Sequence, residues 1–213
     1  MRDFKRMSLA LRGMCGVGCC CVLVVMLLNV GCLKRPPADK KQFVIDVTRP
    51  VGGESSDSGI VLQVRLARVS PMYESPGFVY KKGDGTYEQD FYNEFFTSPG
   101  YIFTEELRQW FSNAPFVKQL SDAGTVGKST HALSTRINAL YGDYSGNATT
   151  AVLEMEFNLV KKGEGSGIVF HKVYSRVMMT DGRAPDDLVR GWTDGLEEIL
   201  LELESDLAAD VPF

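Results

Sequence analysis

The pattern of apolar residues in the last third of the chain places the strongest constraint on the fold. Between Ala151 and Val160, apolar and polar residues alternate, which predicts a strand with one buried face. A glycine-rich turn at 163–167 leads into a second extended run at 169–180, so we expect a hairpin. From Pro185 onward the apolar residues recur at helical spacing. They form one stripe of Leu188, Trp192, Leu196, Ile199, Leu200, Leu203 and Leu207. A stripe of this length has to be covered, and we expect it to pack flat on the sheet.

Shorter strands and one further helix are predicted upstream. The expected strands lie at 42–48, 60–70, 78–82, 86–96 and 132–144, and the segment 116–120 is either a strand or a last helical turn. Gly83-Asp84-Gly85 between two of these runs is a strong hairpin signal, and apolar spacing predicts a helix over Tyr101–Phe111. Sequential hairpins and two separate helices indicate an α+β fold. We expect an antiparallel or mixed sheet with two main helices packed on one face in a single domain.

The N-terminal segment has the pattern of a bacterial lipoprotein signal. A basic start over residues 2–12 precedes a nearly unbroken apolar run over 14–28. The sequence LLNVGC is then similar to a lipobox, with the small residue Gly31 before the cleavage point and Cys32 as the residue that receives the lipid. Such a protein is anchored to a membrane without spanning it. The predicted organisation is a signal peptide over 1–31, a lipidated tether over 32–41 and an α+β domain over 42–213.

Two other interpretations of the leader stay open. One is an uncleaved signal anchor, although the apolar run of about 15 residues is short of the roughly 20 that a membrane span needs. The other is an ordinary secretory signal followed by an incidental cysteine. The five cysteines favour lipid attachment, because four of them lie inside the leader and cleavage would leave Cys32 alone. A disulfide scaffold and a cysteine-based metal site are therefore excluded for the mature domain.

Charge and the residue after Cys32 bear on partners and location. The leader holds four of the 23 basic residues but one of the 27 acidic residues, so the mature domain is more acidic than the whole chain. An acidic domain without a basic block argues against nucleic acid as a partner. Leu33 stands where an Asp would retain a lipoprotein in enterobacterial sorting, which implies export to the outer membrane. We therefore predict lipid anchoring on the periplasmic face of the outer membrane, with the inner membrane as the alternative.

The sequence contains no set of residues with the spacing of a known catalytic or metal-binding motif. The two histidines, His131 and His171, have no His or acidic neighbour at metal-ligand spacing. The glycine-rich turns lack the spacing and the lysine of a phosphate-binding loop. Glu197, Glu198, Glu202 and Glu204 are interpreted as the solvated side of the last helix rather than as an acid–base pair. We therefore predict that the protein is not an enzyme and binds neither a metal nor a cofactor.

A cluster of aromatic residues has two interpretations. It comprises Phe91, Tyr92, Phe95, Phe96, Tyr101 and Phe103. The rings are either core, where a strand meets a helix, or partly exposed, as a partner surface or in contact with acyl chains. The candidate partner surface consists of Phe91, Phe95, Phe96 and Tyr101, and the burial of each ring decides between the two interpretations.

The order of these features resembles one family. The lipobox is followed by a strand with Ile60–Val64, by the sequence VSPMY over Val69–Tyr73 and by a hairpin arm over Phe78–Gly85. An aromatic strand at 87–96 and a helix come next, and a strand and a leucine-rich helix close the chain. Over roughly 42–207 this pattern resembles the ABC-type transport auxiliary lipoproteins, the family of the paraquat-inducible C-type lipoproteins.

The resemblance implies a non-catalytic role. Proteins of this family are accessory parts of ABC systems that contain a permease and a "mammalian cell entry" (MCE) lipid-binding protein and that move lipids between the two membranes. It implies a lipoprotein that docks the periplasmic end of the MCE assembly at the outer membrane. A homo-oligomer is a further expectation, because MCE proteins are ring-shaped. The alternative functions are a lipoprotein that assists barrel-protein or lipopolysaccharide insertion in the outer membrane, and a periplasmic hydrolase.

Overall fold

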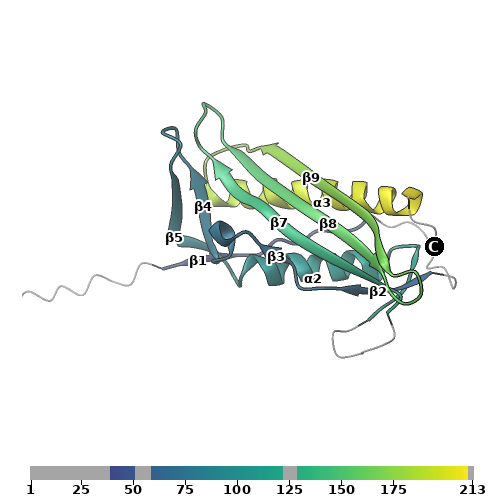
Figure 1. The fold of residues 1–213 in the computed structure, drawn as a ribbon. Helices are drawn as coiled ribbons and strands as arrows, with labels where there is room; N and C mark the ends of the chain where they lie inside the picture. The colour runs from purple at the N-terminus through teal and green to yellow at the C-terminus, as the bar shows by residue number, and fades with distance from the viewer. Residues whose placement is uncertain (1–38, 51–58, 122–128, 211–213) are drawn as a thin grey trace, which may run out of the picture. The chain divides into compact units, whose positions relative to one another are not determined.

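A mixed β-sheet carries two long helices in the part of the chain that the computed structural model describes, residues 39–50, 59–121 and 129–210 (Figure 1). The helices are α2 (Pro99–Ser112) and α3 (Pro185–Asp210), with one 3-10 turn, η1 (Pro71–Tyr73). The strands within these ranges are β1 (Lys41–Phe43), β2 (Ile60–Val64), β3 (Arg68–Val69), β4 (Gly77–Lys81), β5 (Tyr87–Phe95), β6 (Val117–Leu120), β7 (His131–Asp143), β8 (Thr150–Lys161) and β9 (Gly167–Met179). The predicted α+β class is confirmed.

Strand β7 organises the sheet. One of its edges pairs with antiparallel β8 over its full length, from His131 opposite Lys161 to Asp143 opposite Thr150. The other edge pairs in turn with the short parallel strands β2, β3 and β4. β9 extends the sheet on the far side of β8. On the other side, β5 pairs with β4, β1 pairs with β5, and β6 lies beside β2. The predicted hairpins β4–β5 and β8–β9 are both present.

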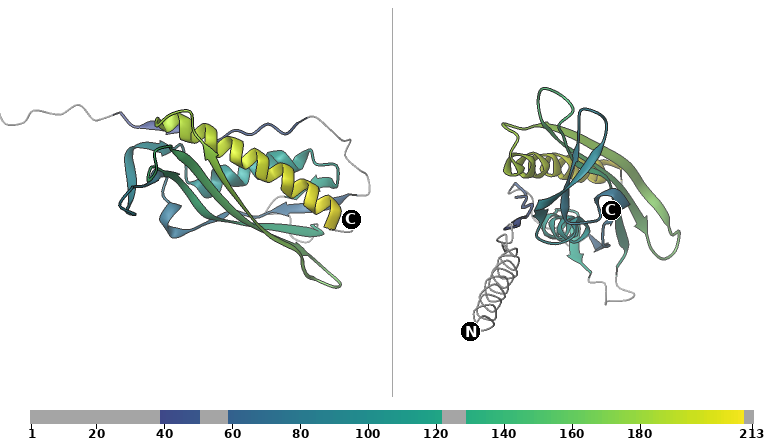
Figure 2. Two further views of the ribbon diagram at one scale, coloured as in Figure 1. Left: turned by 90° about the horizontal axis from the view of Figure 1, so that it is seen from above. Right: turned by 90° about the vertical axis from the view of Figure 1, so that its left-hand side faces the viewer.

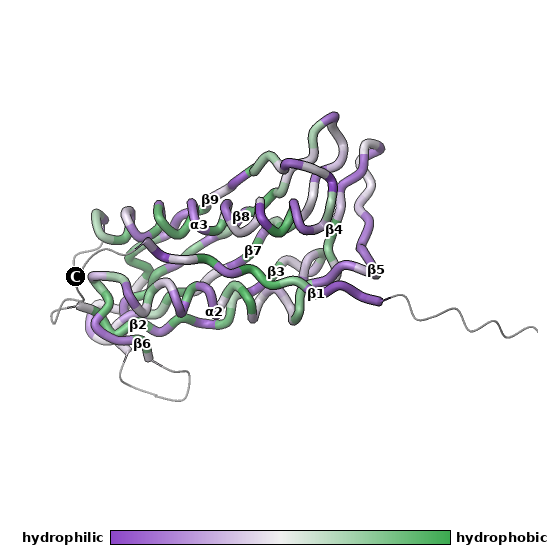
Figure 3. The backbone as a smooth tube through the Cα atoms, turned by 180° about the vertical axis from the view of Figure 1, so that it is seen from behind, coloured by the Kyte–Doolittle hydropathy of each residue, from purple (hydrophilic) through white to green (hydrophobic). Residues whose placement is uncertain are grey.

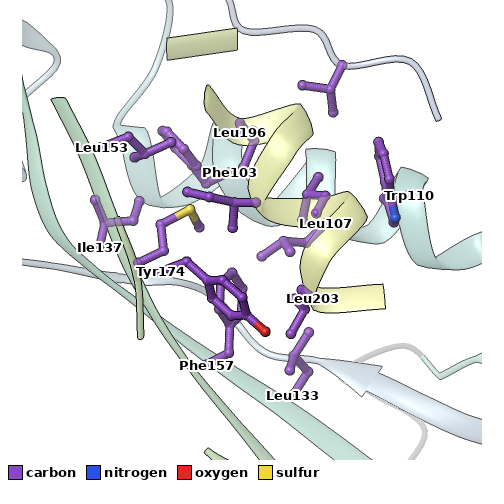
Figure 4. Close-up of a cluster of buried hydrophobic side chains, with 14 of the residues drawn as sticks. Phe103, Leu107, Trp110, Leu133, Ile137, Leu153, Phe157, Tyr174, Leu196 and Leu203 are labelled. Atoms are coloured by element: carbon purple, nitrogen blue, oxygen red, sulfur yellow. The ribbon is translucent and has the colours of Figure 1, made fainter. Parts of the chain in front are cut away.

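Both helices lie on one face of the sheet, and Figure 1 views the opposite face (Figure 2). Alternate residues of β8 point toward the helices, and Leu153, Met155 and Phe157 are at most 1 % exposed. All seven residues of the predicted stripe on α3 are buried, and the hydrophobic positions of this helix recur with its turns (Figure 3). Figure 4 shows Leu196 and Leu203 of α3 among side chains from α2 and the central strands. The core is therefore a layer between one sheet face and two helices.

Two glycines let α3 come close to the sheet. A Cβ atom on Gly191 would lie 2.7 Å from the Cβ of Ala151, and one on Gly195 would lie 3.2 Å from the Cγ of Met178. A glycine inside a helix costs about 0.5–1 kcal/mol relative to alanine. Here the missing side chain makes room for β8 and β9, so the glycines determine how near the helix axis lies to the sheet.

Two predicted strands are shorter than their sequence patterns suggest. The run 60–70 is split into β2 and β3, because the Ala67 N–H donates to the Thr104 hydroxyl at 2.9 Å instead of to a neighbouring strand. The run 42–48 pairs only over β1, and beyond it the Val47 N–H donates to the Glu106 carboxylate at 2.9 Å. In both places a side chain of α2 accepts a hydrogen bond from the backbone. The segment 116–120 contains a strand, β6, and not a helical turn.

A substitution of Trp192 tests how α3 packs on the sheet. Its indole is fully buried, with its ring centroid 5.1 Å from that of Phe78 and 5.5 Å from that of Phe95. We expect Trp192→Ala to lower the free energy of unfolding by about 3–5 kcal/mol, because it leaves a cavity between α3 and the β4–β5 hairpin. Urea denaturation measures this loss. Leu201→Ala, on the exposed side of the same helix, is the control and should lose less than about 1 kcal/mol. An equally small loss for Trp192→Ala would contradict the packing described above.

Candidate functional site

An exposed, mostly aromatic surface runs along β1, from its beginning to just past its end. It comprises Val44, Phe91, Tyr92, Phe96 and Tyr101, whose exposed fractions lie between 52 % and 67 %. Phe91 and Tyr92 belong to β5, Phe96 follows that strand, and Tyr101 lies in the first turn of α2. Because β1 pairs with β5, the start of the folded domain runs along this surface. Exposed rings gathered in this way are typical of surfaces that meet a partner or a membrane.

A bulge in β5 exposes two of these rings. The pairing of β5 with β4 shifts its register between Gln89 and Glu94. The Asp90 carboxylate fixes the bulge by accepting hydrogen bonds from the Tyr92 and Asn93 N–H groups and from the Tyr80 hydroxyl at 2.6 Å. Burial alone would raise the pKa of Asp90, but these hydrogen bonds outweigh it and hold the pKa below its usual value. The sequence signal for this feature is an aspartate two residues before the exposed tyrosine, in an Asx turn.

Phe95 does not belong to the aromatic surface, so this part of the predicted partner surface is wrong. Its side chain is 2 % exposed, and its ring centroid lies 4.7 Å from that of Phe78. After the bulge β5 resumes its alternation, which turns Phe95 into the core and leaves Phe96 outside. Phe91, Phe96 and Tyr101 are exposed, and their role as a partner surface stays a prediction.

A hollow of about 340 Å³ joins Val44 to Tyr101 along one side of α2. Glu106 lines this hollow and accepts the hydrogen bond from the Val47 N–H, which holds the segment after β1 against the helix. Burial raises the pKa of Glu106 above its usual 4.5, the Val47 hydrogen bond opposes the rise, and the negative charges of Asp46 and Glu105 add to it. Ionisation of Glu106 therefore lowers the free energy of unfolding.

The acidic side of α3 is paired with β9 and stays open to solvent, since the side chains of Glu198 and Glu202 are 52% and 40% exposed. The Arg176 guanidinium lies 2.8 Å from Glu198 and 2.6 Å from Glu202. The Lys172 ammonium lies 2.7 Å from Asp206, whose carboxylate also accepts a hydrogen bond from the Tyr174 hydroxyl. These pairs flank the apolar stripe and fix the rotation of α3 about its axis. They are structural contacts rather than an acid–base site.

Glu204 connects three distant segments. Its carboxylate lies 2.7 Å from the Arg49 guanidinium and accepts a hydrogen bond from the Trp110 indole N–H at 2.8 Å. The hydrogen bonds that Arg49 donates to Glu204 are the main cause that raises the pKa of Arg49. The contact ties the segment after β1 and the C-terminal end of α2 to α3. Sequence reasoning missed it, because the partners are far apart along the chain.

The residues singled out for chemistry do not converge in the part of the chain that the structure describes. His131 is buried at the start of β7, where burial lowers its pKa, and His171 is exposed on β9 with its Nε2 3.1 Å from Glu156. Residues 39–50, 59–121 and 129–210 contain no group of acidic or His side chains that could hold a metal ion. Within the same ranges no helix has the length and hydrophobicity to cross a membrane. Gly31 and Cys32 lie outside the described residues.

Comparisons with known proteins identify the fold. Neither a known family nor a curated protein sequence matches the chain. A solved structure of a Xanthomonas campestris protein described as DUF330 matches with a TM-score of 0.68 at 11% identity, over 78% of this chain and 94% of that one. An uncharacterised protein matches with a TM-score of 0.64 at 14% identity, over 79% and 99%. A hypothetical protein of Chlamydia trachomatis matches with a TM-score of 0.53 at 7% identity, over 71% and 99%. At these identities the likeness establishes a shared fold and nothing about activity.

Glu106 gives a test of the contact between α2 and the segment after β1. Because its pKa is raised on folding, the folded state keeps a proton that the unfolded state loses above pH 4.5, so stability falls as the pH rises through that window. We expect Glu106→Gln to reduce the loss of unfolding free energy between pH 4.5 and neutral pH, measured by urea denaturation at both pH values. Glu164→Gln, in an exposed turn, is the control and should leave the wild-type loss unchanged. An identical pH dependence in Glu106→Gln and the wild type would show that Glu106 carries no such cost.

Proposed function

We propose that this protein is a membrane-anchored, non-catalytic auxiliary lipoprotein of an ABC/MCE-type lipid transport system. In this proposal Cys32 carries the lipid, and the folded domain lies at the periplasmic face of the outer membrane. The aromatic surface docks the MCE assembly and its permease. The support comes from the lipobox and the order of elements in the sequence, and from the exposed rings beside β1. The matching fold of the Xanthomonas campestris protein agrees with the proposal without testing it.

The short connection between Cys32 and the domain supports anchoring. Lys40, the residue before β1, follows Cys32 by eight residues, and an extended chain spans about 3.5 Å per residue, so the tether reaches no further than about 30 Å. Two prolines, Pro36 and Pro37, stiffen it. Each buried methylene of an acyl chain contributes about 0.8 kcal/mol, so a lipoprotein with several chains stays on its membrane. A domain held in this way meets its partner at a high effective concentration.

The aromatic surface is the observation that carries the docking role. Its five residues are more than half exposed, although large apolar rings normally enter the core. The hydrogen bonds that Asp90 accepts stabilise the bulge in which Phe91 and Tyr92 are exposed to solvent. Lys40 lies 4.9 Å above the Phe91 ring and 2.8 Å from the Glu94 carboxylate, which places an ion pair at the rim of the surface. Aromatic residues with a charged rim are the composition of protein interfaces.

The anchor is tested by Cys32→Ala. We expect the variant to move from the membrane fraction to the soluble fraction while keeping its thermal unfolding temperature, because the lipid and the folded core are independent. Fractionation after a high-salt wash, with immunodetection, measures the distribution. Leu33→Ala, which keeps the cysteine, is the control and should stay on the membrane. A Cys32→Ala protein that survives the high-salt wash in the membrane fraction would overturn the anchor assignment.

Docking is tested by crosslinking from the aromatic surface. A photoreactive phenylalanine analogue in place of Phe96 is expected to capture an MCE-family protein or a permease subunit in whole cells, as identified by mass spectrometry. The same analogue at Leu201 on α3 is the matched control and should not capture it. Capture of a barrel-assembly or lipopolysaccharide-insertion protein would assign the alternative function. Crosslinks to lipid alone would make this surface a membrane contact instead of a docking site.

A further inference from the structure

A groove of about 580 Å³ lies on the helix-free face of the sheet, where β2, β3 and β7 meet near the start of β9. This is the face toward the viewer in Figure 1. Three arginines line it: Arg65 after β2, Arg68 on β3 and Arg136 on β7. Two exposed apolar side chains, Leu66 and Ile168, lie along the same groove. The proposed docking function uses none of these five residues.

The backbone brings the three arginines together. Arg68 and Arg136 are register partners in the parallel pair β3–β7, so their side chains leave the same face of the sheet side by side. Arg65 reaches that face as well, because its guanidinium donates to the Ser134 hydroxyl at 3.1 Å. The break between β2 and β3, where Ala67 turns toward α2, opens the space between these strands. The groove is therefore a consequence of the interrupted strand.

The arginines lack the acidic partners that other basic residues of this domain have. Within the described ranges no carboxylate lies at ion-pair distance from Arg65, Arg68 or Arg136, whereas Arg49 and Arg176 are both paired. Glu156 also lines the groove: hydrogen bonds with the His171 ring at 3.1 Å and with Asn158 lower the pKa of its carboxylate, and the charge of Arg136 adds to this lowering. Three arginines against one carboxylate leave the groove with an excess of positive charge, and a bound anion lowers the remaining repulsion. In an acidic protein, such a cluster is selective for a negative ligand.

We propose that this groove binds the phosphate headgroup of an anionic lipid. The guanidinium group presents a planar set of N–H donors that matches the oxygens of a phosphate, and two or more such groups converge here. Leu66 and Ile168 are 53% and 65% exposed, and they offer apolar surface to the glycerol and acyl parts of the same molecule. The volume suits a headgroup with the first part of its chains. This inference does not depend on the anchor at Cys32 or on the docking surface.

The experiment uses the full-length protein purified in a non-ionic detergent. Dihexanoyl phosphatidic acid, dihexanoyl phosphatidylcholine and inorganic phosphate are titrated separately below their micelle concentrations, and calorimetry gives each Kd. We expect phosphatidic acid to bind about tenfold or more tightly than either of the other two, because only it combines an unshielded phosphate with apolar chains. Equal binding of phosphatidylcholine would mean that the charge is irrelevant. Equal binding of inorganic phosphate would mean that the lipid is not the ligand.

Variants then assign the binding to the groove. The triple variant Arg65→Gln, Arg68→Gln and Arg136→Gln should bind phosphatidic acid at least about tenfold more weakly, with an unchanged unfolding temperature because all three side chains are exposed. A second triple variant, with Lys41, Arg183 and Arg190 each changed to Gln, removes the same charge elsewhere and should keep the affinity within about twofold.

A conservative variant and a competing peptide test the nature of the ligand further. The single variant Arg68→Lys keeps the charge but loses the planar donors, so it should lie between the wild type and the triple variant. Undiminished binding in the arginine triple variant, or an equal loss in the control triple variant, would overturn the assignment. Displacement of phosphatidic acid by a glutamate-rich peptide at lower concentration would make the ligand an acidic protein segment instead.

Discussion

The two unequal edges of β7 are the constraint on which the rest of the structure depends. One edge is filled by β8 along its whole length, with one register shift between Ile137 and Ala139, and the other is divided among three short parallel strands. Parallel neighbours cannot be joined by tight turns, so the chain has to cross over between them and β7. α2 lies in this crossover, on the same face as α3, and within the described ranges the opposite face carries the 3-10 turn η1 but no α-helix (Figure 1). The position of the helices and the free face therefore follow from one pattern of strand pairing.

Ion pairs fix the position that apolar packing alone leaves free. The buried stripe of α3 can slide or rotate on a flat apolar sheet at little cost, because hydrophobic contact is not directional. The pairs from Arg176 and Lys172 to the acidic side of α3 select one rotation, and the Arg49–Glu204 contact selects one position along the helix. The pairs from Arg176 and Lys172 are partly open to solvent and contribute less than about 1 kcal/mol each, so their role is to define the arrangement more than to stabilise it.

Local patterns predicted the elements, and long-range contacts explain the differences. The alternation in β8 and the stripe on α3 are confirmed, because each depends on neighbours within a few residues. The break in the run 60–70 was not predictable, since its cause is a hydroxyl on α2. The candidate surface was predicted in part: the aromatic cluster stood out, but the sequence could not separate the buried Phe95 from the exposed Phe96. That separation depends on the bulge that Asp90 stabilises.

Tyr101 links the two surfaces to which functions are proposed. Its exposed ring borders the hollow beside Val44, and it also lines a second hollow, of about 510 Å³, together with Leu66, Arg68 and Arg136. The second hollow shares those three residues with the arginine groove. Glu74 and Ser98 line this second hollow as well, so the Tyr101 ring stands between the hollow beside Val44 and a hollow of mixed polarity that borders the arginine cluster. The groove proposed for an anionic lipid and the surface proposed for docking are therefore neighbours that meet at Tyr101 but take different ligands, since one offers guanidinium donors and the other exposed rings.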